Sequence, residues 1–404
     1  MIDERICICL CEEIPHAVFL KNMVSGMKEK NINMVFLTAN LSVYMFLKEH
    51  NVSEIVLVKK GNCNCPKRDM HTVKECLDGS LSLEEARTLY TSTYNEIRKY
   101  SEKNKIDMII ASQGLRAAEL ALKDFAKERN IKVIFFELSN IPAKTFFDVE
   151  GSNAKSWLYE HIDVLDKFIV DDIEYKNWRE NYLKTNFKNH EVKQAVSFTK
   201  LNWKHGLLSR FGYLYTGVKV KRVDVLKKFT SLIEVKIMGK IKYDRLDLLN
   251  TRYIFFPMQV SCDSQVIINS DIKLFDALEY CISQAKQENA ILVVKLHPAE
   301  PDLQVIKRVM ALRRKYNFKV VNDNTFFVIK NAFKVITINS TVALESMIIG
   351  KTVEILGRSY YKKFNYERLK CYILRYLVDL DYFADKPFTL EEINGLYDRF
   401  ISKR

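Results

Sequence analysis

Short polar motifs directly follow apolar runs in the last third of the sequence, and their side chains are suited to binding an anion. Asn339, Ser340 and Thr341 lie between an apolar run and a run with helical periodicity. Hydroxyl groups before a helix cap its first N–H groups, and the same end of a helix can receive a phosphate. The motif therefore fits a helix cap alone or a cap that also holds a phosphate. Glu345 lies one helical turn further on, where its carboxylate could reach a ribose.

Two further groups in this part of the chain could take part in chemistry. His297 and Pro298 follow the apolar run 290–296, where a histidine is either structural or catalytic. Asp263 lies in a loop beyond the apolar run 253–256. It could be a turn residue, or it could act as a nucleophile or base.

The N-terminal half has a comparable candidate in Glu137, which ends the apolar run 132–136. Burial at such a position raises the pKa of a carboxylate, which suits a general acid or base, although a solvated carboxylate at a strand end is an equal alternative. Gln113 and Gly114, after the run 107–111, are expected to face the cleft into which Glu137 would point. Small and polar residues downstream predict a loop that forms part of a site: Pro142, Ala143, Lys144, Thr145, Asp148, Gly151, Asn153, Ala154 and Ser156.

The elements that must position these residues are short apolar runs that alternate with helical ones. This pattern predicts strands at 5–11, 33–38, 54–58, 107–111, 132–136, 253–256, 290–296, 319–321, 334–338 and 352–356. It indicates an α/β fold with two parallel, doubly wound sheets, which bind ligands beyond the carboxyl ends of their strands. The predicted domains are 1–158, a helical and strongly basic middle segment 159–250, a second α/β domain 251–380, and a C-terminal helix 381–404.

Composition excludes several classes of protein. The chain has 404 residues, of which 48% are hydrophobic, with only 12 Gly and 7 Pro, so general disorder is not expected. The nine cysteines have no disulfide framework and predict a reduced, cytosolic protein. Cys63, Cys65, His71 and Cys76 could form a zinc site, but their spacing matches no common zinc pattern and favours a polar loop with free thiols. The apolar run 6–11 is too short for a secretory signal, and no run approaches the length of a membrane span.

The excess of positive charge is local. Between Lys184 and Lys242 there are 14 Lys and Arg residues and three acidic residues, so this segment carries +11 of the net charge of +13. Such a patch suits a membrane surface, an acidic glycan or nucleic acid, or it is a solvated helical face. Phe211, Tyr213, Leu214 and Tyr215 lie beside it in the sequence.

In order along the chain, these motifs resemble the capsular polysaccharide β-Kdo transferases, which transfer a 3-deoxy sugar acid. The C-terminal part of the resemblance consists of Phe256-Pro257-Met258-Gln259, Asp263-Ser264-Gln265, Lys295-Leu296-His297-Pro298, Asn339-Ser340-Thr341-Val342, Glu345, Gly350-Lys351 and Gly357. The N-terminal part resembles the branch that attaches the first Kdo to a lyso-phospholipid, through Phe136-Glu137, Pro142, Asp148, Gly151-Ser152-Asn153-Ala154 and Ser156. Together they cover residues 109–361.

The resemblance implies a glycosyltransferase B architecture with two Rossmann-like halves, CMP-β-Kdo as donor, retention of configuration, and no metal or other cofactor. It implies that Asp263 is the nucleophile, that Glu137 is an essential acidic residue, and that His297 is the third catalytic group. His297, Ser340 and Thr341 would hold the CMP phosphate and Glu345 the ribose. The remaining substrate-binding residues would be Gln113, Asp148, Asn153, Gln259, Ser264, Gln265, Lys295, Pro298 and Asn339.

We therefore expect a transferase that adds Kdo to a lipid or glycan acceptor in capsule synthesis. Its expected partners are the CMP-sugar, an anionic acceptor, the inner face of the cytoplasmic membrane, a second capsule transferase and the export machinery, but no nucleic acid. The alternative is a transferase for sialic acid or another nonulosonate, because the His-Pro and Ser-Thr pair is shared with bacterial sialyltransferases. A binding module without enzymatic activity is the third hypothesis, and it leaves the ordered strand-end residues unexplained.

Overall fold

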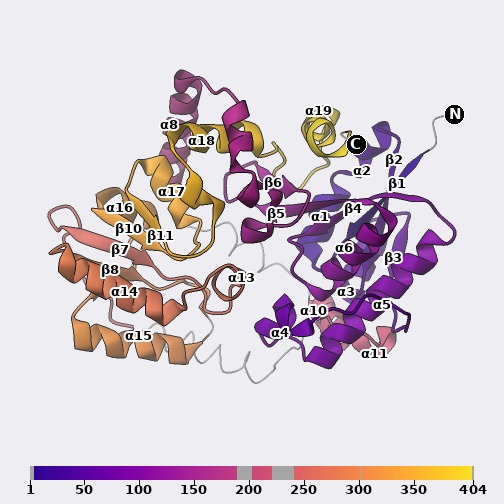
Figure 1. Cartoon of the computed structure of the whole chain (residues 1–404), viewed down its shortest axis with the longest axis horizontal. Helices are drawn as coiled ribbons and strands as arrows, with labels where there is room; N and C mark the ends of the chain where they lie inside the picture. Colours follow the sequence, from indigo (N-terminus) through magenta and orange to yellow (C-terminus); the bar gives the residue numbers. More distant parts are fainter. Residues whose placement is uncertain (1–3, 189–202, 221–240, 301, 403–404) are drawn as a thin grey trace. The chain divides into compact units, whose positions relative to one another are not determined.

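Two compact α/β units, each with its own sheet, make up the described part of the chain (Figure 1). The computed structural model describes residues 4–188, 203–220, 241–300 and 302–402. The first unit combines the segments 1–161, 193–223 and 375–404, and the second combines 162–192 with 224–374. The predicted fold class, two Rossmann-like α/β units as in glycosyltransferase B proteins, is confirmed by the two sheets.

The first unit contains a six-stranded sheet with the strand order β3-β2-β1-β4-β5-β6. Neighbouring strands are parallel except β5 and β6, which are antiparallel. The strands are β1 (Arg5–Leu10), β2 (Ile32–Thr38), β3 (Ile55–Leu57), β4 (Ile106–Ser112), β5 (Lys132–Leu138) and β6 (Thr145–Asp148). The central strands read as continuous apolar runs because helices bury both of their faces.

Helices cover the two faces of this sheet as separate sets. Alternate strand residues such as Ile8 and Ile109 pack against α5 (Leu83–Ser101) and α6 (Ala117–Arg129). Their neighbours in the strands, such as Cys7 and Ile110, face the opposite way, as the two-residue period requires. That second face is covered by α1 (Ile14–Lys21), α2 (Val24–Glu29), α3 (Leu41–Glu49) and α19 (Leu390–Leu396).

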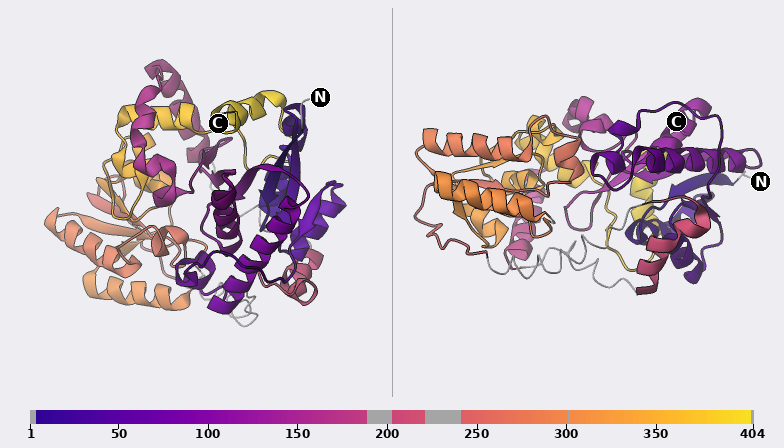
Figure 2. Two further views of the ribbon diagram at one scale, coloured as in Figure 1. Left: turned by 45° about the vertical axis from the view of Figure 1, so that its right-hand side comes forward. Right: turned by 90° about the horizontal axis from the view of Figure 1, so that it is seen from below.

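The second unit has a five-stranded parallel sheet with the order β11-β10-β7-β8-β9. Its strands are β7 (Tyr253–Pro257), β8 (Ile291–Lys295), β9 (Lys319–Val320), β10 (Lys334–Thr337) and β11 (Val353–Ile355). Phe256 and Val294 pack towards α14 (Leu274–Gln287) and α15 (Leu303–Tyr316), while Phe255 and Val293 pack on the other face. That other face is covered by α16 (Thr325–Asn331) and α17 (Val342–Ile349), and Figure 2 shows these layers from two further directions.

The middle of the chain is divided between the two units, which differs from the single domain expected at 159–250. Helix α8 (Asp172–Lys188) packs in the second unit, where the Arg179 guanidinium donates to the carbonyl oxygens of Ile348 and Ile349 at the end of α17. Helices α10 (Trp203–Phe211) and α11 (Tyr213–Thr216) pack in the first unit. Most of the basic segment, 189–202 and 221–240, lies outside the described residues.

The C-terminal segment belongs to the first unit, although it follows the second in sequence. The backbone N–H of Phe388 donates to the Asn22 carbonyl at 2.8 Å, and Ile393 is fully buried in the core of the first unit. The buried side of α19 is therefore used for packing. Because of this burial, residues 375–404 belong to the first unit. The predicted domains 251–380 and 381–404 place the boundary between residues 380 and 381 instead.

Strand β6 is the main correction to the predicted elements. Residues 142–156 are expected to be a loop, but Thr145–Asp148 pairs with β5, placing Phe146 opposite Glu137. None of the helices in the described part of the chain combines the length and the hydropathy needed to cross a membrane.

The packing of α19 on α2 can be tested at two glycines. A methyl group at Gly26 in α2 would lie 2.6 Å from Cγ1 of Ile393, whereas one at Gly395 in α19 would be in ordinary contact with Val378 at 3.7 Å. We expect Gly26→Ala to lower the free energy of unfolding by about 1–3 kcal/mol because the core is overpacked. Gly395→Ala, the matched control, should be neutral or stabilise the chain by up to about 1 kcal/mol. Chemical denaturation measures both, and equal effects would contradict this packing.

Candidate functional site

The order in which the chain adds strands to the second sheet reverses between β7 and β10. The chain builds β7, β8 and β9 outward on one side and then returns to place β10 and β11 on the other. In parallel α/β sheets such a switch point leaves a crevice at the carboxyl edge, where ligands bind. The residues that follow β7 and β10 include Gln259 and the Asn339-Ser340-Thr341 motif, so the structure brings these predicted residues to the switch point.

Asn339 ties the loops at this edge together. Its backbone N–H donates to Oε1 of Gln259 at 2.8 Å, and its Nδ2 donates to the carbonyl oxygens of Gln265 at 3.0 Å and Asn269 at 2.6 Å. Asn339 and Gln259 are both only 6% exposed. Gly357 packs so closely on the Asn339 amide that a Cβ there would lie 2.3 Å from Nδ2. These contacts assign a structural role to two residues predicted to bind substrate.

Ser340 and Thr341 lie at the start of α17. The Ser340 hydroxyl accepts from the backbone N–H of Val342 at 3.2 Å, whereas the Thr341 side chain makes no cap hydrogen bond. The Ser340 side chain therefore binds a backbone N–H at the start of α17, whereas Thr341 occupies the N-cap position itself. Phosphate binding by the same end of the helix stays a prediction.

His297 lies beyond β8, on a half-buried turn that fixes its tautomer. Its Nδ1 accepts from the backbone N–H of Ala299 at 3.1 Å, so the neutral ring carries its proton on Nε2. Burial lowers the pKa of His297, while the nearby charges of Asp263 and Glu300 oppose the fall. The imidazole is thus a neutral Nε2–H donor at pH 7. Pro298, which follows, is exposed.

Asp263 is positioned by the short helix α13 (Ser264–Ile267) that follows it. Its Oδ1 accepts from the backbone N–H of Gln265 at 3.0 Å, and its own N–H donates to the Val260 carbonyl at 3.0 Å. The carboxylate is half-buried and close enough to act electrostatically on His297. The side chain of Ser264, a predicted substrate-binding residue, lies outside the described residues.

Lys295 and Glu345 lie within electrostatic range of each other at this edge. The Lys295 Nζ donates to the Asp323 carbonyl at 2.6 Å and to Oγ1 of Thr325 at 2.9 Å. Burial lowers the pKa of Lys295. Burial also raises the pKa of Glu345 to about 7, against the opposing positive charge of Lys295. Glu345 can therefore exchange a proton near neutral pH, as donor or acceptor towards a hydroxyl.

Glu300 is a residue of this site that sequence analysis missed. It is 7% exposed, and its carboxylate accepts from the N–H and hydroxyl of Ser261 at 2.7 and 2.9 Å and from the N–H of Asp302 at 3.0 Å. These contacts join the turn after β8 to the loop that carries Asp263. The available signal was its place three residues after His297.

In the first unit, three predicted residues meet at the carboxyl edge of the sheet. Glu137 accepts from the Gln113 amide at 3.0 Å and from the Asn153 amide at 2.9 and 3.2 Å. Gln113 and Asn153 both have positive φ angles, 21° and 51°, which are uncommon outside glycine and mark a constrained loop. Gly151 allows the loop to approach, because a Cβ there would lie 2.9 Å from the Lys155 carbonyl.

Asp148 organises this loop through hydrogen bonds of its carboxylate. It is 1% exposed, and its carboxylate accepts from four backbone N–H groups, those of Glu150, Gly151, Trp157 and Leu158. Burial raises its pKa, while these four hydrogen bonds oppose the rise. Its contacts therefore position the loop that carries Asn153.

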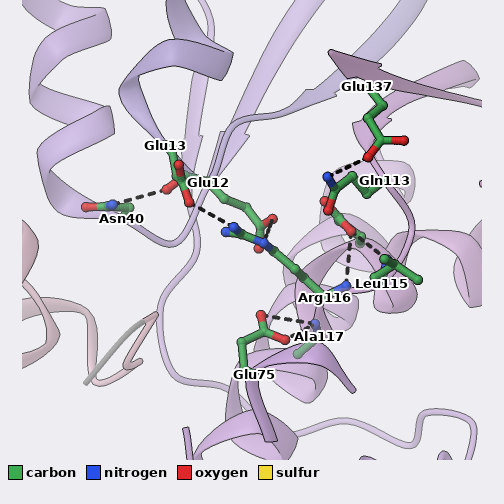
Figure 3. A network of polar contacts seen from close by, with 10 residues as sticks. Glu12, Glu13, Asn40, Glu75, Gln113, Leu115, Arg116, Ala117 and Glu137 are labelled. Carbon is green, nitrogen blue, oxygen red and sulfur yellow. Dashed lines mark hydrogen bonds and ion pairs between the residues drawn. The ribbon is translucent and has the colours of Figure 1, made fainter. Parts of the chain in front are cut away.

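A partly buried ionic network beside Glu137 was also missed (Figure 3). It lies at the switch point of the first sheet, between β1 and β4, where Glu12 and Glu13 follow one strand and Arg116 follows the other. Arg116 donates to Glu13 at 2.8 Å and lies 3.7 Å from Glu12. Glu75 accepts from the backbone N–H of Ala117 at 3.2 and 3.3 Å. The sequence feature that could have revealed this network is the pair of charged motifs directly after β1 and β4, the two strands that border the switch point.

Electrostatics within this network favour protons on the buried carboxyl groups. Burial raises the pKa of Glu12 well above its usual range and that of Glu75 to about 7, although Arg116 opposes both shifts. Burial would lower the pKa of Arg116, but the surrounding carboxylates raise it. Arg116 therefore stays charged beside the carboxyl groups of Glu12 and Glu13.

The cysteines considered as zinc ligands have other contacts. The Cys63 thiol donates to the Thr91 carbonyl at 3.7 Å, and the Cys76 thiol donates to the Ser82 carbonyl at 3.8 Å. In the described residues, no three or more His, Cys, Asp or Glu side chains form a group that could hold a metal ion.

Comparison with known proteins gives the family. The family model described as "Capsule polysaccharide biosynthesis protein" matches residues 107–364, well over half of the chain. The chain belongs to this family, which confirms the resemblance to capsular polysaccharide proteins. The branch that acts on a lyso-phospholipid stays a prediction. A curated relative, Protein FixF of Sinorhizobium fredii (strain NBRC 101917 / NGR234), is 34% identical over 128 residues, which are 30% of this chain and 30% of FixF. The match therefore spans under a third of that relative's length.

Solved structures with a similar chain path include two classes of protein. Thermosulfurimonas dismutans KpsC, beta Kdo 2,7 transferase, is 15% identical, with a TM-score of 0.42 over 76% of this chain and 89% of that chain. Methanocaldococcus jannaschii UDP-GlcNAc 2-epimerase is 12% identical, with a TM-score of 0.33 over 98% of this chain and 99% of that chain. No conclusion about activity rests on likenesses at this level.

The buried carboxyl of Glu345 makes the stability of the chain depend on pH. Its pKa is about 7 in the folded chain against an ordinary value of 4.5, so the folded chain holds the extra proton between these values and loses stability as pH rises through them. Glu345→Gln should therefore stabilise the chain at pH 8 by up to about 3 kcal/mol, with little gain at pH 4.5. Thermal unfolding at both pH values measures this. The exposed Glu279→Gln is the control, and a gain that does not change with pH would contradict the assignment.

Proposed function

We propose that the chain is a retaining glycosyltransferase that moves Kdo from CMP-β-Kdo onto a lipid or glycan acceptor in capsule polysaccharide synthesis. The observation that carries the proposal is the set of groups at the carboxyl edge of the second sheet. A half-buried carboxylate, Asp263, lies within electrostatic range of a neutral imidazole, His297, and both lie at the edge that also carries Ser340 and α17. Membership of the capsule family supports the pathway.

The donor would bind through its nucleotide. In this proposal the His297 Nε2–H and the N-terminal end of α17, with Ser340 and Thr341, donate to the CMP phosphate. Glu345 accepts or donates a hydrogen bond at the ribose, and Lys295 adds positive charge nearby. These groups stabilise the departing CMP without requiring a metal ion.

Transfer would take place in two displacements. The Asp263 carboxylate forms a bond to the anomeric carbon of Kdo as the bond to the CMP phosphate oxygen breaks, giving a covalent glycosyl–enzyme and free CMP. Glu137 then takes the proton of the acceptor hydroxyl, whose oxygen displaces Asp263 from the same carbon. Two inversions give net retention. The Gln113 and Asn153 amides would orient Glu137 for this step.

The acceptor side is proposed on different grounds. Glu137 belongs to the first unit and Asp263 to the second. A lyso-phospholipid or a growing glycan on the inner face of the cytoplasmic membrane is the proposed acceptor, with a second capsule transferase and the export machinery as further partners.

A transferase for sialic acid or another nonulosonate is the second candidate. His297, Ser340 and Thr341 are placed to meet the phosphate, which every CMP-sugar shares, and they carry no information about the sugar. Parallel assays with CMP-Kdo and CMP-sialic acid distinguish the two donors.

The decisive test is CMP release from CMP-Kdo with a lyso-phosphatidylglycerol acceptor. Asp263→Asn should lower turnover by about 10³-fold or more because the nucleophile is lost, and Glu137→Gln should lower it by about 10²–10⁴-fold because the base is lost. The exposed Glu279→Gln should keep wild-type turnover.

Two results would contradict the proposal. Turnover with CMP-sialic acid alone would overturn the sugar, and an Asp263→Asn variant with full turnover would overturn the mechanism. Circular dichroism of each variant separates loss of chemistry from loss of fold.

A further inference from the structure

Helices α10 and α11 of the first unit present an exposed apolar surface. Leu214 and Tyr215 are 72% and 64% exposed, and Leu207 and Phe211 are each 47% exposed. We name Leu207, Phe211, Leu214 and Tyr215 the α10–α11 surface. Single exposed apolar residues are ordinary, but four within nine positions of one segment indicate a binding surface.

The opposite side of this segment is firmly packed. Gly212 lies against Leu41, where a Cβ would come within 2.6 Å of the Leu41 Cβ. The backbone N–H of Lys60 donates to the Thr216 carbonyl at 2.7 Å, and Val218 is buried in the core of the first unit. The segment that carries these side chains is therefore packed against the first unit (Figures 1 and 2).

Cations surround the α10–α11 surface. Lys59 Nζ lies 4.9 Å from the centre of the Tyr215 ring, and Arg210 Cζ lies 5.2 Å from that of Phe211. Lys219 lies 5.2 Å from the Tyr213 ring and also pairs with Glu85. Residues 203–220 contain no Asp or Glu, and the surrounding segment 184–242 carries a net charge of +11.

We propose that the α10–α11 surface docks the enzyme on an anionic phospholipid bilayer. Exposed aliphatic and aromatic side chains enter the interface between headgroups and acyl chains, and adjacent Lys and Arg residues are attracted to anionic headgroups. Leu214 is the most exposed side chain of the four, and it favours a bilayer over nucleic acid because a leucine has no ring on which a base can stack.

The surface also lies close to the acceptor-side edge of the first sheet. It borders a shallow hollow lined by Asn40, Leu41, Arg210 and Tyr213. The Asn40 amide donates to the Glu12 carbonyl at 3.1 Å, which joins this hollow to the loop after β1. Docking would therefore hold the first unit's switch point close to the membrane, where a lipid acceptor is found.

The test is co-sedimentation of the full chain, without donor, with vesicles of phosphatidylcholine alone or mixed equally with phosphatidylglycerol. We expect binding to the mixed vesicles, and the double variant Leu214→Ser/Tyr215→Ser should weaken it about tenfold or more. Leu249→Ser, which alters a leucine that is 69% exposed in the second unit, is the matched control and should bind as wild type. Unchanged thermal unfolding confirms that the variants fold.

Equal binding by wild type and double variant would overturn the inference, as would equal binding to both kinds of vesicle. Binding to single-stranded DNA without binding to vesicles would also overturn it and favour nucleic acid. The measurement needs no donor, so it can fail while CMP-Kdo turnover succeeds, and the reverse also holds. The double variant should keep full transferase activity towards a water-soluble, short-chain acceptor.

Discussion

The hydrogen bonds of one buried asparagine hold the loops at the carboxyl edge of the second sheet together. The Asn339 backbone N–H donates to the side chain of Gln259, and its side-chain amide donates to the carbonyl groups of Gln265 and Asn269. Gly357 leaves room for that amide. A buried amide that lacked its partners would cost about 1–3 kcal/mol, so the arrangement of these loops is strongly specified.

In the first unit, charged side chains rather than an amide lie at the switch point of the sheet. Arg116 lies at this point beside Glu12, Glu13 and Glu75, whose negative charges raise the pKa of its guanidinium. Glu137 lies beside this network and is oriented by amides on strained loops. Each unit therefore places a carboxylate at the carboxyl edge of its sheet, with the surrounding polar groups fixing its direction.

Sequence predicted the strands of both units well, because short apolar runs between helices have few alternative folds. It missed β6, since Thr145–Asp148 is a short antiparallel edge strand among polar residues. It also did not foresee that Asp148 and Asn339, both predicted to bind substrate, make hydrogen bonds to backbone groups of their own units. Such partners come from distant loops and leave no local pattern. The network around Arg116 was missed because isolated charges after strands resemble solvated ones.

The proposed reaction depends on CMP binding at the carboxyl edge of the second sheet. Calorimetric titration of CMP into the wild-type chain and into His297→Ala tests this binding. We expect saturable binding with one site per chain, weakened about tenfold in the variant because a hydrogen bond to a charged phosphate is lost. Absence of saturable binding, or equal affinity in the two proteins, would contradict it.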